Sequence, residues 1–299
     1  MSTLRTLYLL ADGGGTKTTI RLLDENLQII GEAKSTSGNI KTSPEGAWQS
    51  TEKALLELID QSELKKVQVI AVMGMAGFES EKSKEKFIQT KPNYIYSLDL
   101  ISDGQIACIG SHAGKDGALV IIGTGVKGFQ VEGDKTSEVA GWGFPYSDEG
   151  GGAWIGMEAI RLTFRAIDKR IKPSMLTEKI LSSYENNPSK LLDHVIKATP
   201  KEFGDFCRDV VYCALENDKE AIDLLKSAAN EILEVIDSLK EKQHSKTLLP
   251  LALAGGVSDY IKPYLPIEVQ KRIVQRQGNA LDGAQYYLKK NIIKWGMTC

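Results

Sequence analysis

The sequence predicts an α/β fold made of two domains with similar topology. A strand, a glycine-rich turn and a second strand occur twice, first around Asp12 and again around Gly123. Residues 67–73 are almost entirely apolar, which is typical of a strand buried on both faces of a mainly parallel sheet. With 299 residues, the chain has the length of two ordinary domains.

The composition is that of a globular protein without a dominant charge. Hydrophobic residues make up 42% and charged residues 25% of the chain, and the net charge is −2. No dense run of lysine and arginine occurs, so neither nucleic acid nor a membrane surface is expected as the main partner. No signal peptide and no apolar run of about 20 residues is expected. The four widely spaced cysteines predict a reduced, cytoplasmic protein without a structural zinc or iron–sulfur site.

The first glycine turn predicts a phosphate-binding site. Three glycines after Asp12 separate two apolar runs, residues 7–10 and 19–23, that we expect to be strands. Without Cβ atoms, the N–H groups of such a turn can point at one anion. Asp12 supplies the carboxylate that a phosphate-bound Mg²⁺ requires, and Thr16 and Lys17 add a hydroxyl and a cation. The alternative is an ordinary hairpin with a solvated lysine.

The next segments predict alternating strands and helices. Residues 28–33 fit a third strand, and residues 35–40 fit a polar, exposed loop. Ser43 followed by Pro44 is typical of a helix start, and the spacing of apolar residues predicts a helix to about residue 62. Residues 80–89 predict a mostly polar helix.

Asp103 lies where a predicted strand gives way to a helix that ends near residue 112. In open α/β sheets, ligands bind at the carboxyl ends of the strands, so a carboxylate here is a candidate functional group. Aspartate at the start of a helix is also explained by N-capping. The local sequence leaves both interpretations open.

The second glycine turn, residues 123–125, lies between predicted strands at residues 118–122 and 128–131. Its likeness to the first turn indicates two domains that hold a phosphate chain between their turns. Two such turns are harder to explain by chance than one.

Residues 140–152 combine aromatic residues, glycines and neighbouring carboxylates ahead of a helix at residues 153–167. A sugar has an apolar face and a rim of hydroxyls, so an aromatic ring beside carboxylates suits a sugar site. The alternative is a glycine-rich lead into the helix, with Asp148 as its cap.

The rest of the chain is mostly helical. Residues 175–243 predict helices with breaks at Pro188 and Pro200. A strand at residues 248–254 then leads into a third glycine turn, which opens another helix. Residues 273–274 fit a short strand and residues 279–290 a closing helix.

These motifs together resemble the sugar kinases of the actin/Hsp70/hexokinase superfold. The closest resemblance is to the N-acetylglucosamine kinase and glucosamine kinase branch of the BadF/BadG-type ATPase family. It spans nearly the full length, and it depends on five motifs, at residues 12–17, 102–104, 123–125, 141–150 and 254–257. The motif at residues 141–150 is the most specific to the amino-sugar branch.

The resemblance implies two ribonuclease-H-like (actin-like ATPase) domains, with ATP and sugar in an interdomain cleft. The N-terminal domain would comprise residues 1–115 and a C-terminal helix at about 279–299. The C-terminal domain, with a helical insertion, would comprise residues 116–278. A homodimer is also implied.

The resemblance also implies the roles of individual residues. Asp103 would be the catalytic base, and Asp12 would hold Mg²⁺ through water. The implied nucleotide-binding residues are Asp12, Gly13, Gly14, Gly15, Thr16, Lys17, Gly123, Thr124, Gly125, Gly255 and Gly256. The implied sugar-binding residues are Asn39, Asp103, Thr124, Gly141, Trp142, Asp148 and Glu149. The chain departs from related kinases at Val126, where serine is usual.

The implied activity is the ATP-dependent phosphorylation of the 6-hydroxyl of glucosamine or N-acetylglucosamine. The paired carboxylates Asp148 and Glu149 favour the cationic glucosamine. Two alternatives remain, an ATPase that activates another enzyme and a regulatory protein that binds nucleotide and sugar without turnover. The intact Asp103 favours the kinase over the regulatory protein.

Overall fold

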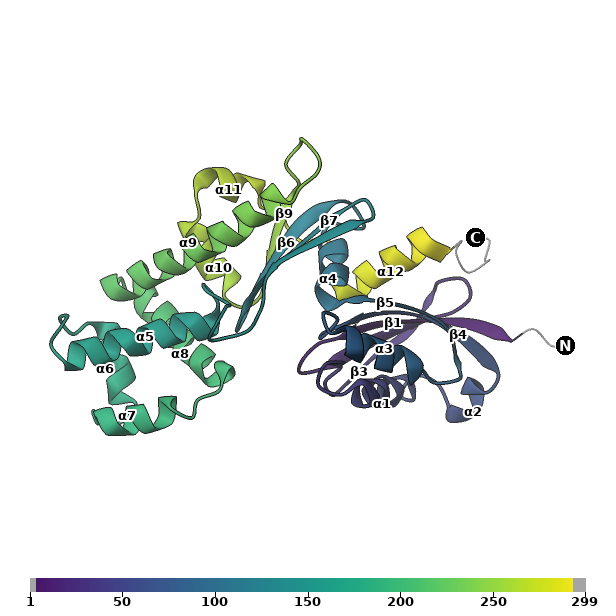
Figure 1. Cartoon of the computed structure of the whole chain (residues 1–299), viewed down its shortest axis with the longest axis horizontal. Coiled ribbons are helices and arrows are strands. Elements are labelled where there is room, and N and C mark those ends of the chain that lie inside the picture. The colour runs from purple at the N-terminus through teal and green to yellow at the C-terminus, as the bar shows by residue number, and fades with distance from the viewer. Residues whose placement is uncertain (1–3, 293–299) are drawn as a thin grey trace. The chain divides into compact units, whose positions relative to one another are not determined.

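The computed structural model describes residues 4–292, and the chain divides into two compact units. Within the described residues, unit 1 comprises residues 4–117 and 275–292, and unit 2 comprises residues 118–274. Each unit has its own sheet and its own hydrophobic core. Figure 1 shows both sheets with their helices.

Unit 1 contains a five-stranded mixed sheet in the order β3-β2-β1-β4-β5. Its central strands β1, β4 and β5 are parallel, whereas β2 is antiparallel to both β1 and β3. The strands are β1 (Arg5–Gly13), β2 (Thr18–Leu23), β3 (Ile29–Ser35), β4 (Val67–Met75) and β5 (Ile95–Ser102). The helices are α1 (Pro44–Leu55), α2 (Gln61–Leu64), α3 (Glu81–Gln89), α4 (Asp103–Ser111) and α12 (Ala280–Asn291).

Helices cover both faces of this sheet (Figure 1). Side chains alternate along a strand, so odd-numbered residues of β1 pack against α1 and α3, whereas even-numbered ones pack against α4 and α12. Leu9 and Leu10 illustrate the two sides, and both are fully buried. The helix α12, which is far from β1 in sequence, therefore completes one face of the sheet.

Two glycines bring α4 and α12 into backbone contact. An added Cβ at Gly110 would lie 1.9 Å from the carbonyl oxygen of Asn279, and one at Gly283 would lie 1.8 Å from that of Ile106. On its other side, α12 is joined to β2 by the buried Arg21, which pairs with Asp282 at 2.9 Å. A larger residue at either glycine would push the two helices apart.

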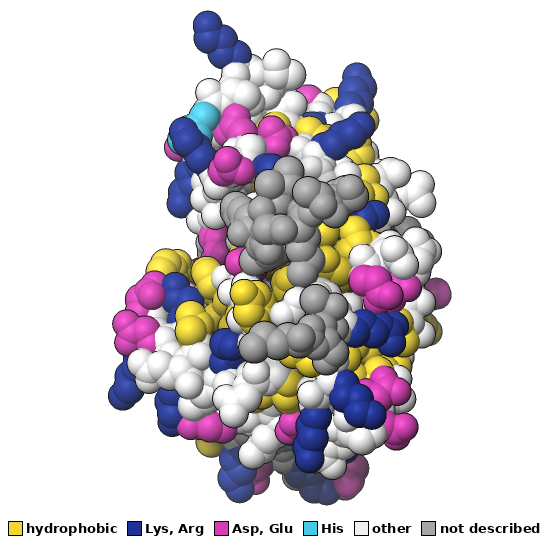
Figure 2. Space-filling model, turned by 90° about the vertical axis from the view of Figure 1, so that its right-hand side faces the viewer, with side chains coloured by type: hydrophobic (Ala, Val, Ile, Leu, Met, Phe, Trp, Pro, Cys, Tyr) yellow, Lys and Arg dark blue, Asp and Glu magenta, His cyan; other side chains and the backbone are white. Residues whose placement is uncertain are grey.

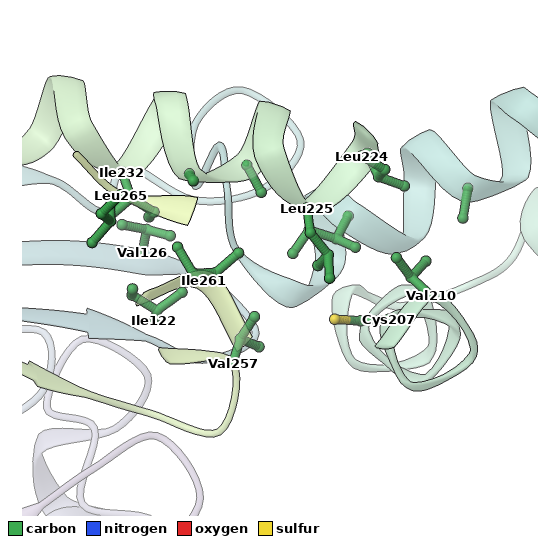
Figure 3. Close-up of a cluster of buried hydrophobic side chains, with 14 of the residues drawn as sticks. Ile122, Val126, Cys207, Val210, Leu224, Leu225, Ile232, Val257, Ile261 and Leu265 are labelled. Carbon is green, nitrogen blue, oxygen red and sulfur yellow. The ribbon is translucent and has the colours of Figure 1, made fainter. Parts of the chain in front are cut away.

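Unit 2 contains a four-stranded sheet in the order β8-β7-β6-β9. Its strands are β6 (Gly117–Ile122), β7 (Val126–Glu132), β8 (Lys135–Ala140) and β9 (Leu251–Ala254). The helices are α5 (Gly152–Ile167), α6 (Met175–Ser182), α7 (Pro188–Val195), α8 (Pro200–Leu215), α9 (Lys219–Glu241), α10 (Ser258–Ile261) and α11 (Ile267–Arg272), with a 3₁₀ turn η1 (Lys262–Tyr264). Figure 3 shows side chains of β6, β7, α8 and α9 converging on one core.

Several expectations need correction. The strand β8 was not predicted, because its residues are mostly polar and lie at the edge of the sheet. The helix expected to reach residue 62 ends at Leu55. The loop at residues 35–40 is not simply exposed, since Ile40 is fully buried. Of the expected C-terminal segment 279–299, residues 293–299 lie outside the described residues.

The surface agrees with the mixed composition. On the face drawn in Figure 2, basic and acidic side chains alternate rather than gathering into an area of one sign. Across residues 4–292, no helix combines the length and hydropathy that crossing a membrane requires.

Candidate functional site

The first glycine turn joins β1 to β2 and leaves its tip open. The N–H of Gly14 donates to the carbonyl of Lys17 (2.9 Å), and residues 15–17 are exposed. An added Cβ at Gly15 would meet no heavy atom within 4 Å, and the backbone there is not left-handed. The fold therefore does not require glycine at position 15, whereas a ligand that approaches the backbone would.

The loop that carries Asn39 is pressed against this turn. The N–H of Gly38 donates to Gly14 (3.0 Å), and an added Cβ at Gly38 would lie 2.6 Å from the Cα of Gly13. The half-buried Asn39 uses its Oδ1 to accept two backbone N–H groups that follow it, at 2.9 and 3.2 Å. The Oδ1 of Asn39 therefore serves the loop itself, and its Nδ2 is the group of this amide that could donate to a ligand.

Asp12 and Asp103 lie at the carboxyl ends of parallel strands of unit 1. Asp12 is in register with Gly74 of β4, which is in register with Ile101 of β5, two residues before Asp103. Even-numbered residues of β1 point to the face of the sheet that α4 covers, so Asp12 belongs to that face. Asp103 is the first residue of α4. The two carboxylates therefore belong to the same face of the sheet.

The two carboxylates also interact electrostatically. Burial, followed by repulsion from Asp103, raises the pKa of Asp12 from 3.8 to about 6, and Lys17 partly offsets this rise. A cation bound beside Asp12 would relieve both effects, because it would compensate the lost hydration and the repulsion. The structure thus offers a carboxylate suited to a metal ion such as Mg²⁺.

The packing of α4 fixes the place of Asp103. The N-cap residue of this helix is Ser102, whose Oγ accepts the N–H of Gln105 (3.1 Å), so Asp103 is not the cap. The Oδ1 of Asp103 accepts the N–H of Gly104 (2.9 Å) at the start of the helix. Gly74 lets α4 approach β4, since an added Cβ there would lie 2.2 Å from Ile106.

In unit 2, the second glycine turn is tied to the start of α5. The N–H of Gly123 donates to Gly125 (2.9 Å) and closes the turn. The N–H groups of Gly152 and Ala153 then donate to the carbonyls of Gly123 (2.8 Å) and Thr124 (2.9 Å). The turn and the segment at residues 140–152 therefore form one structural element.

Asp148 lies directly against this turn. Its Oδ1 accepts the N–H of Val126 (3.3 Å), and an added Cβ at Gly125 would lie 2.5 Å from its Oδ2. Burial is the main cause that raises the pKa of Asp148. Asp148 is not the cap of α5, because that position is held by Gly151 without a side-chain cap, so the capping alternative is wrong here too.

The remaining predicted sugar residues lie on the surface of unit 2. The side chain of Trp142 is 87% exposed, and Glu149 is also exposed. Gly141 has a left-handed φ of 77° and lies close to Lys127, so a side chain would be strained there. Val126, in contrast, is 2% exposed and points into the core, so the residue that replaces the usual serine serves packing (Figure 3).

A cavity of about 760 Å³ in unit 2 joins the second and third glycine turns. Gly123 and Gly256 line it, and an added Cβ at either would meet nothing within 4 Å. Gly255 differs, since its φ is 94° and an added Cβ would lie 2.2 Å from the carbonyl oxygen of Ile122. The fold needs Gly255, whereas the open space at Gly123 and Gly256 suits a bound nucleotide.

The other wall of this cavity is one face of α8, which was not predicted from the sequence. The lining residues that were missed include Lys201, Gly204, Asp205, Arg208, Tyr212 and Tyr260. The five of these residues that lie on α8 recur at helical spacing, and this pattern alone is typical of a helix face that is exposed to solvent. Gly204 was the available signal, because glycine inside a helix costs about 1 kcal/mol and needs a reason.

The structure thus gathers the predicted residues into two groups. Unit 1 brings together residues 12–17, Asn39 and Asp103. Unit 2 brings together residues 123–125, Asp148 and Gly256, whereas Trp142 and Glu149 lie exposed near them in sequence.

Two α/β units, each with a glycine turn between strands, define the class of actin-like, nucleotide-binding proteins. A sequence profile of the BadF/BadG/BcrA/BcrD ATPase family matches residues 11–286, and the chain belongs to this family.

Among its relatives is the glucosamine kinase of Vibrio cholerae serotype O1, which is 30% identical over 97% of this chain and 99% of its own length. The N-acetylmuramic acid/N-acetylglucosamine kinase of Clostridium acetobutylicum is 28% identical over 87% of this chain and 88% of its own. A crystal structure described as an N-acetylglucosamine kinase from Chromobacterium violaceum is 27% identical and covers 95% of this chain and 98% of its own, with a TM-score of 0.78.

Proposed function

We propose that the protein is an ATP-dependent amino-sugar kinase that phosphorylates the 6-hydroxyl of glucosamine or N-acetylglucosamine. Two relatives that match over most of their length are named as kinases of glucosamine and of N-acetylmuramic acid and N-acetylglucosamine. The observation that carries the proposal is the pair Asp12 and Asp103, which share one face of the sheet beside the glycine turn.

In this mechanism Asp103 is the general base. It accepts the proton of the sugar 6-hydroxyl while that oxygen attacks the γ-phosphorus of ATP, and the bond from this phosphorus to the bridging oxygen of ADP breaks. Backbone N–H groups of the glycine turns at residues 13–16 and 123–125, other than those of Gly14 and Gly123 that close the turns, would bind the β- and γ-phosphates. These contacts lower the barrier because they offset the charge on the transferred phosphoryl group.

Asp12 would hold Mg²⁺ through water. Its raised pKa fits this role, because a carboxylate that is buried and repelled by a neighbour gains from a bound cation. When bound, the ion neutralises phosphate charge.

The sugar would be oriented by Asn39, Trp142 and Asp148, with Gly141, Thr124 and Glu149 beside it. The donor Nδ2 of Asn39 suits a hydroxyl acceptor, and the exposed ring of Trp142 suits the apolar face of a pyranose. Burial raises the pKa of Asp148, so this carboxylate would gain from a cationic partner. Glucosamine, whose amine is protonated, is therefore the preferred acceptor of the two.

A coupled assay of ADP release tests the proposal. The panel comprises glucosamine, N-acetylglucosamine, N-acetylmannosamine and glucose, each with ATP and Mg²⁺. We expect glucosamine or N-acetylglucosamine to be turned over at the highest kcat/KM, with the product phosphorylated at the 6-position by NMR. ADP release that does not depend on any sugar would instead support the ATPase alternative.

A further inference from the structure

Unit 2 contains another cavity, of about 370 Å³, toward the C-terminal end of α5. Its size lies within the range of small-molecule sites, about 300–1,000 Å³. The lining residues are Glu158, Arg161, Leu162, Phe164, Arg165 and Arg170. From Ala153, which is tied to Thr124, to Arg165 the helix rises about 18 Å. The cavity therefore lies at the other end of α5 from the second glycine turn.

The end of α5 turns the chain so that Arg170 returns to this cavity. Lys169 is left-handed, with a φ of 59°. The N–H of Lys169 donates to the carbonyl of Ala166 (3.0 Å), and the N–H of Arg170 donates to the carbonyl of Arg165 (2.9 Å), which is the pattern of a Schellman motif. The motif fixes the backbone of Arg170 beside the last turn of the helix, so both arginines line one cavity.

The cavity is strongly cationic. Its three arginines are accompanied by one carboxylate, that of Glu158, which pairs with Arg161. Arg165 and Arg170 form no ion pair within residues 4–292. Residues 158–172 hold five cationic side chains and two carboxylates, although the net charge of the whole chain is −2. An anion that enters this cavity would thus meet a concentrated positive potential.

Arginine favours phosphate among the possible anions. The guanidinium group is a planar fork that binds two phosphate oxygens at once, and it loses its hydration more easily than an ammonium group does. A phosphate monoester carries about two negative charges at pH 7. It would therefore neutralise Arg165 and Arg170, the two arginines of the cavity that have no partner.

The other lining groups suit a sugar. Leu162 and Phe164 are half-buried and pack against the core of unit 2, and both present apolar surface to the cavity. A pyranose ring has an apolar face that can lie on such a surface. The carboxylate of Glu158 is acceptor-only, so it can accept a hydrogen bond from a sugar hydroxyl while it pairs with Arg161. An inorganic anion would leave these groups without a contact.

We propose that this cavity is a binding site for a phosphorylated sugar, with the phosphate group on Arg165 and Arg170 and the ring over Leu162 and Phe164. The inference goes beyond the proposed kinase reaction and does not rest on it, because none of the lining residues has a role in that reaction. It assigns a ligand to a cationic surface that neither the glycine turns nor the packing of unit 2 requires.

Isothermal titration calorimetry with the proposed active site occupied tests this assignment. The protein is held in saturating ADP, Mg²⁺ and glucosamine, and the probes are glucose 6-phosphate, inorganic phosphate and glucose. We expect glucose 6-phosphate to bind with a Kd below about 1 mM and at least about tenfold more tightly than either other probe. No binding of glucose 6-phosphate, or binding of inorganic phosphate that is equally tight, would overturn the proposal.

Variants of the arginines locate the bound phosphate. The double variant Arg165→Gln/Arg170→Gln should bind glucose 6-phosphate at least about tenfold more weakly. Arg165→Lys keeps the charge but loses the fork, and a loss of about threefold is expected. Lys172→Gln is the matched control, because it removes a nearby exposed cation that does not line the cavity, and it should retain the wild-type affinity. Equal losses in the double variant and in Lys172→Gln would show general attraction rather than a site.

The outcome can be separated from that of the proposed kinase activity. The double variant should bind ADP as the wild-type protein does, because both arginines are exposed and lie far along α5 from the second glycine turn. A protein that phosphorylates amino sugars but does not bind glucose 6-phosphate at this cavity refutes only the additional site. A protein that binds it through Arg165 and Arg170 but phosphorylates no sugar refutes only the proposed reaction.

Discussion

Asp103 occupies the first position of α4, after the capping residue Ser102, and its Oδ1 accepts the N–H of Gly104 at 2.9 Å. In Asp103→Asn we expect kcat to fall by at least about a hundredfold, because the amide cannot accept the hydroxyl proton. The dissociation constant for ADP should stay within about twofold. Steady-state kinetics and calorimetry measure the two quantities.

A matched control for this variant is Asp60→Asn, since Asp60 is exposed and makes no capping hydrogen bond with α2. It should leave kcat unchanged. Sugar phosphorylation at the normal rate in Asp103→Asn would show that Asp103 is not the base.

Asp12 gives the unliganded protein a pH-dependent stability. Folding raises the pKa of this acid from 3.8 to about 6, so the folded state holds the proton more tightly than the unfolded chain does. The favourable contribution of protonated Asp12 to the free energy of unfolding is complete below pH 4 and is lost as the pH rises through 6. In Asp12→Asn we therefore expect greater stability than wild type at pH 7, by on the order of 2–3 kcal/mol, and no gain at pH 4.

Thermal unfolding without nucleotide or Mg²⁺, at both pH values, measures this difference. If the variant gains the same stability at pH 4 and pH 7, the ionisation of Asp12 is not the cause. With Mg²⁺ and ADP present, the wild-type protein should be more stable than Asp12→Asn at pH 7, because its carboxylate then interacts with the bound cation.

Trp142 is one of the most exposed aromatic residues among those described. Trp142→Ala should raise KM for the amino sugar by about three- to tenfold and leave KM for ATP unchanged, since the ring would stack only on the sugar. Tyr146→Ala is the matched control, because Tyr146 lies in the same segment and is 92% exposed. An unchanged sugar KM in Trp142→Ala would remove Trp142 from the site.

At the scale of elements, neighbouring glycines of the third turn have different roles. Gly255→Ala should lower the melting temperature by several degrees, because the new Cβ clashes with β6 and the backbone is left-handed. Gly256→Ala should leave the melting temperature unchanged and weaken ADP binding about tenfold, because the space there is open. Differential scanning fluorimetry and calorimetry measure both effects, and equal destabilisation by the two variants would contradict this division.

The main elements could be predicted because their sequence signals are local. An apolar run marks β4, and Ser43 with Pro44 marks the start of α1. The strand β8 and the buried Ile40 could not be predicted in this way, because their places depend on residues distant in sequence.

The same distinction between local and long-range signals applies to the candidate site. Asp12 lies near the end of β1 and Asp103 directly follows β5, each in a glycine-containing motif, and the resemblance to sugar kinases implied their roles. Asp205 and Tyr212 were missed, because a polar face of α8 becomes part of a site only where another element builds a cavity over it.

For the whole molecule, the predicted homodimer is open to direct measurement. Size-exclusion chromatography with light scattering should give twice the 32.8 kDa of one chain at micromolar concentration. The same experiment with Asp103→Asn serves as a control, because its substitution lies in the proposed active site. A mass of one chain at every concentration would contradict the prediction.

The return of α12 to unit 1 also bears on the order in which the nascent chain folds. Unit 2 is one continuous segment, so it has all of its residues once position 274 has left the ribosome. The face of the unit 1 sheet against α4 stays without Leu281, Ala284 and Leu288 until these later residues are translated. Of the two units, unit 1 is therefore begun first and completed last, and a chain truncated after residue 274 would leave apolar residues of this face uncovered.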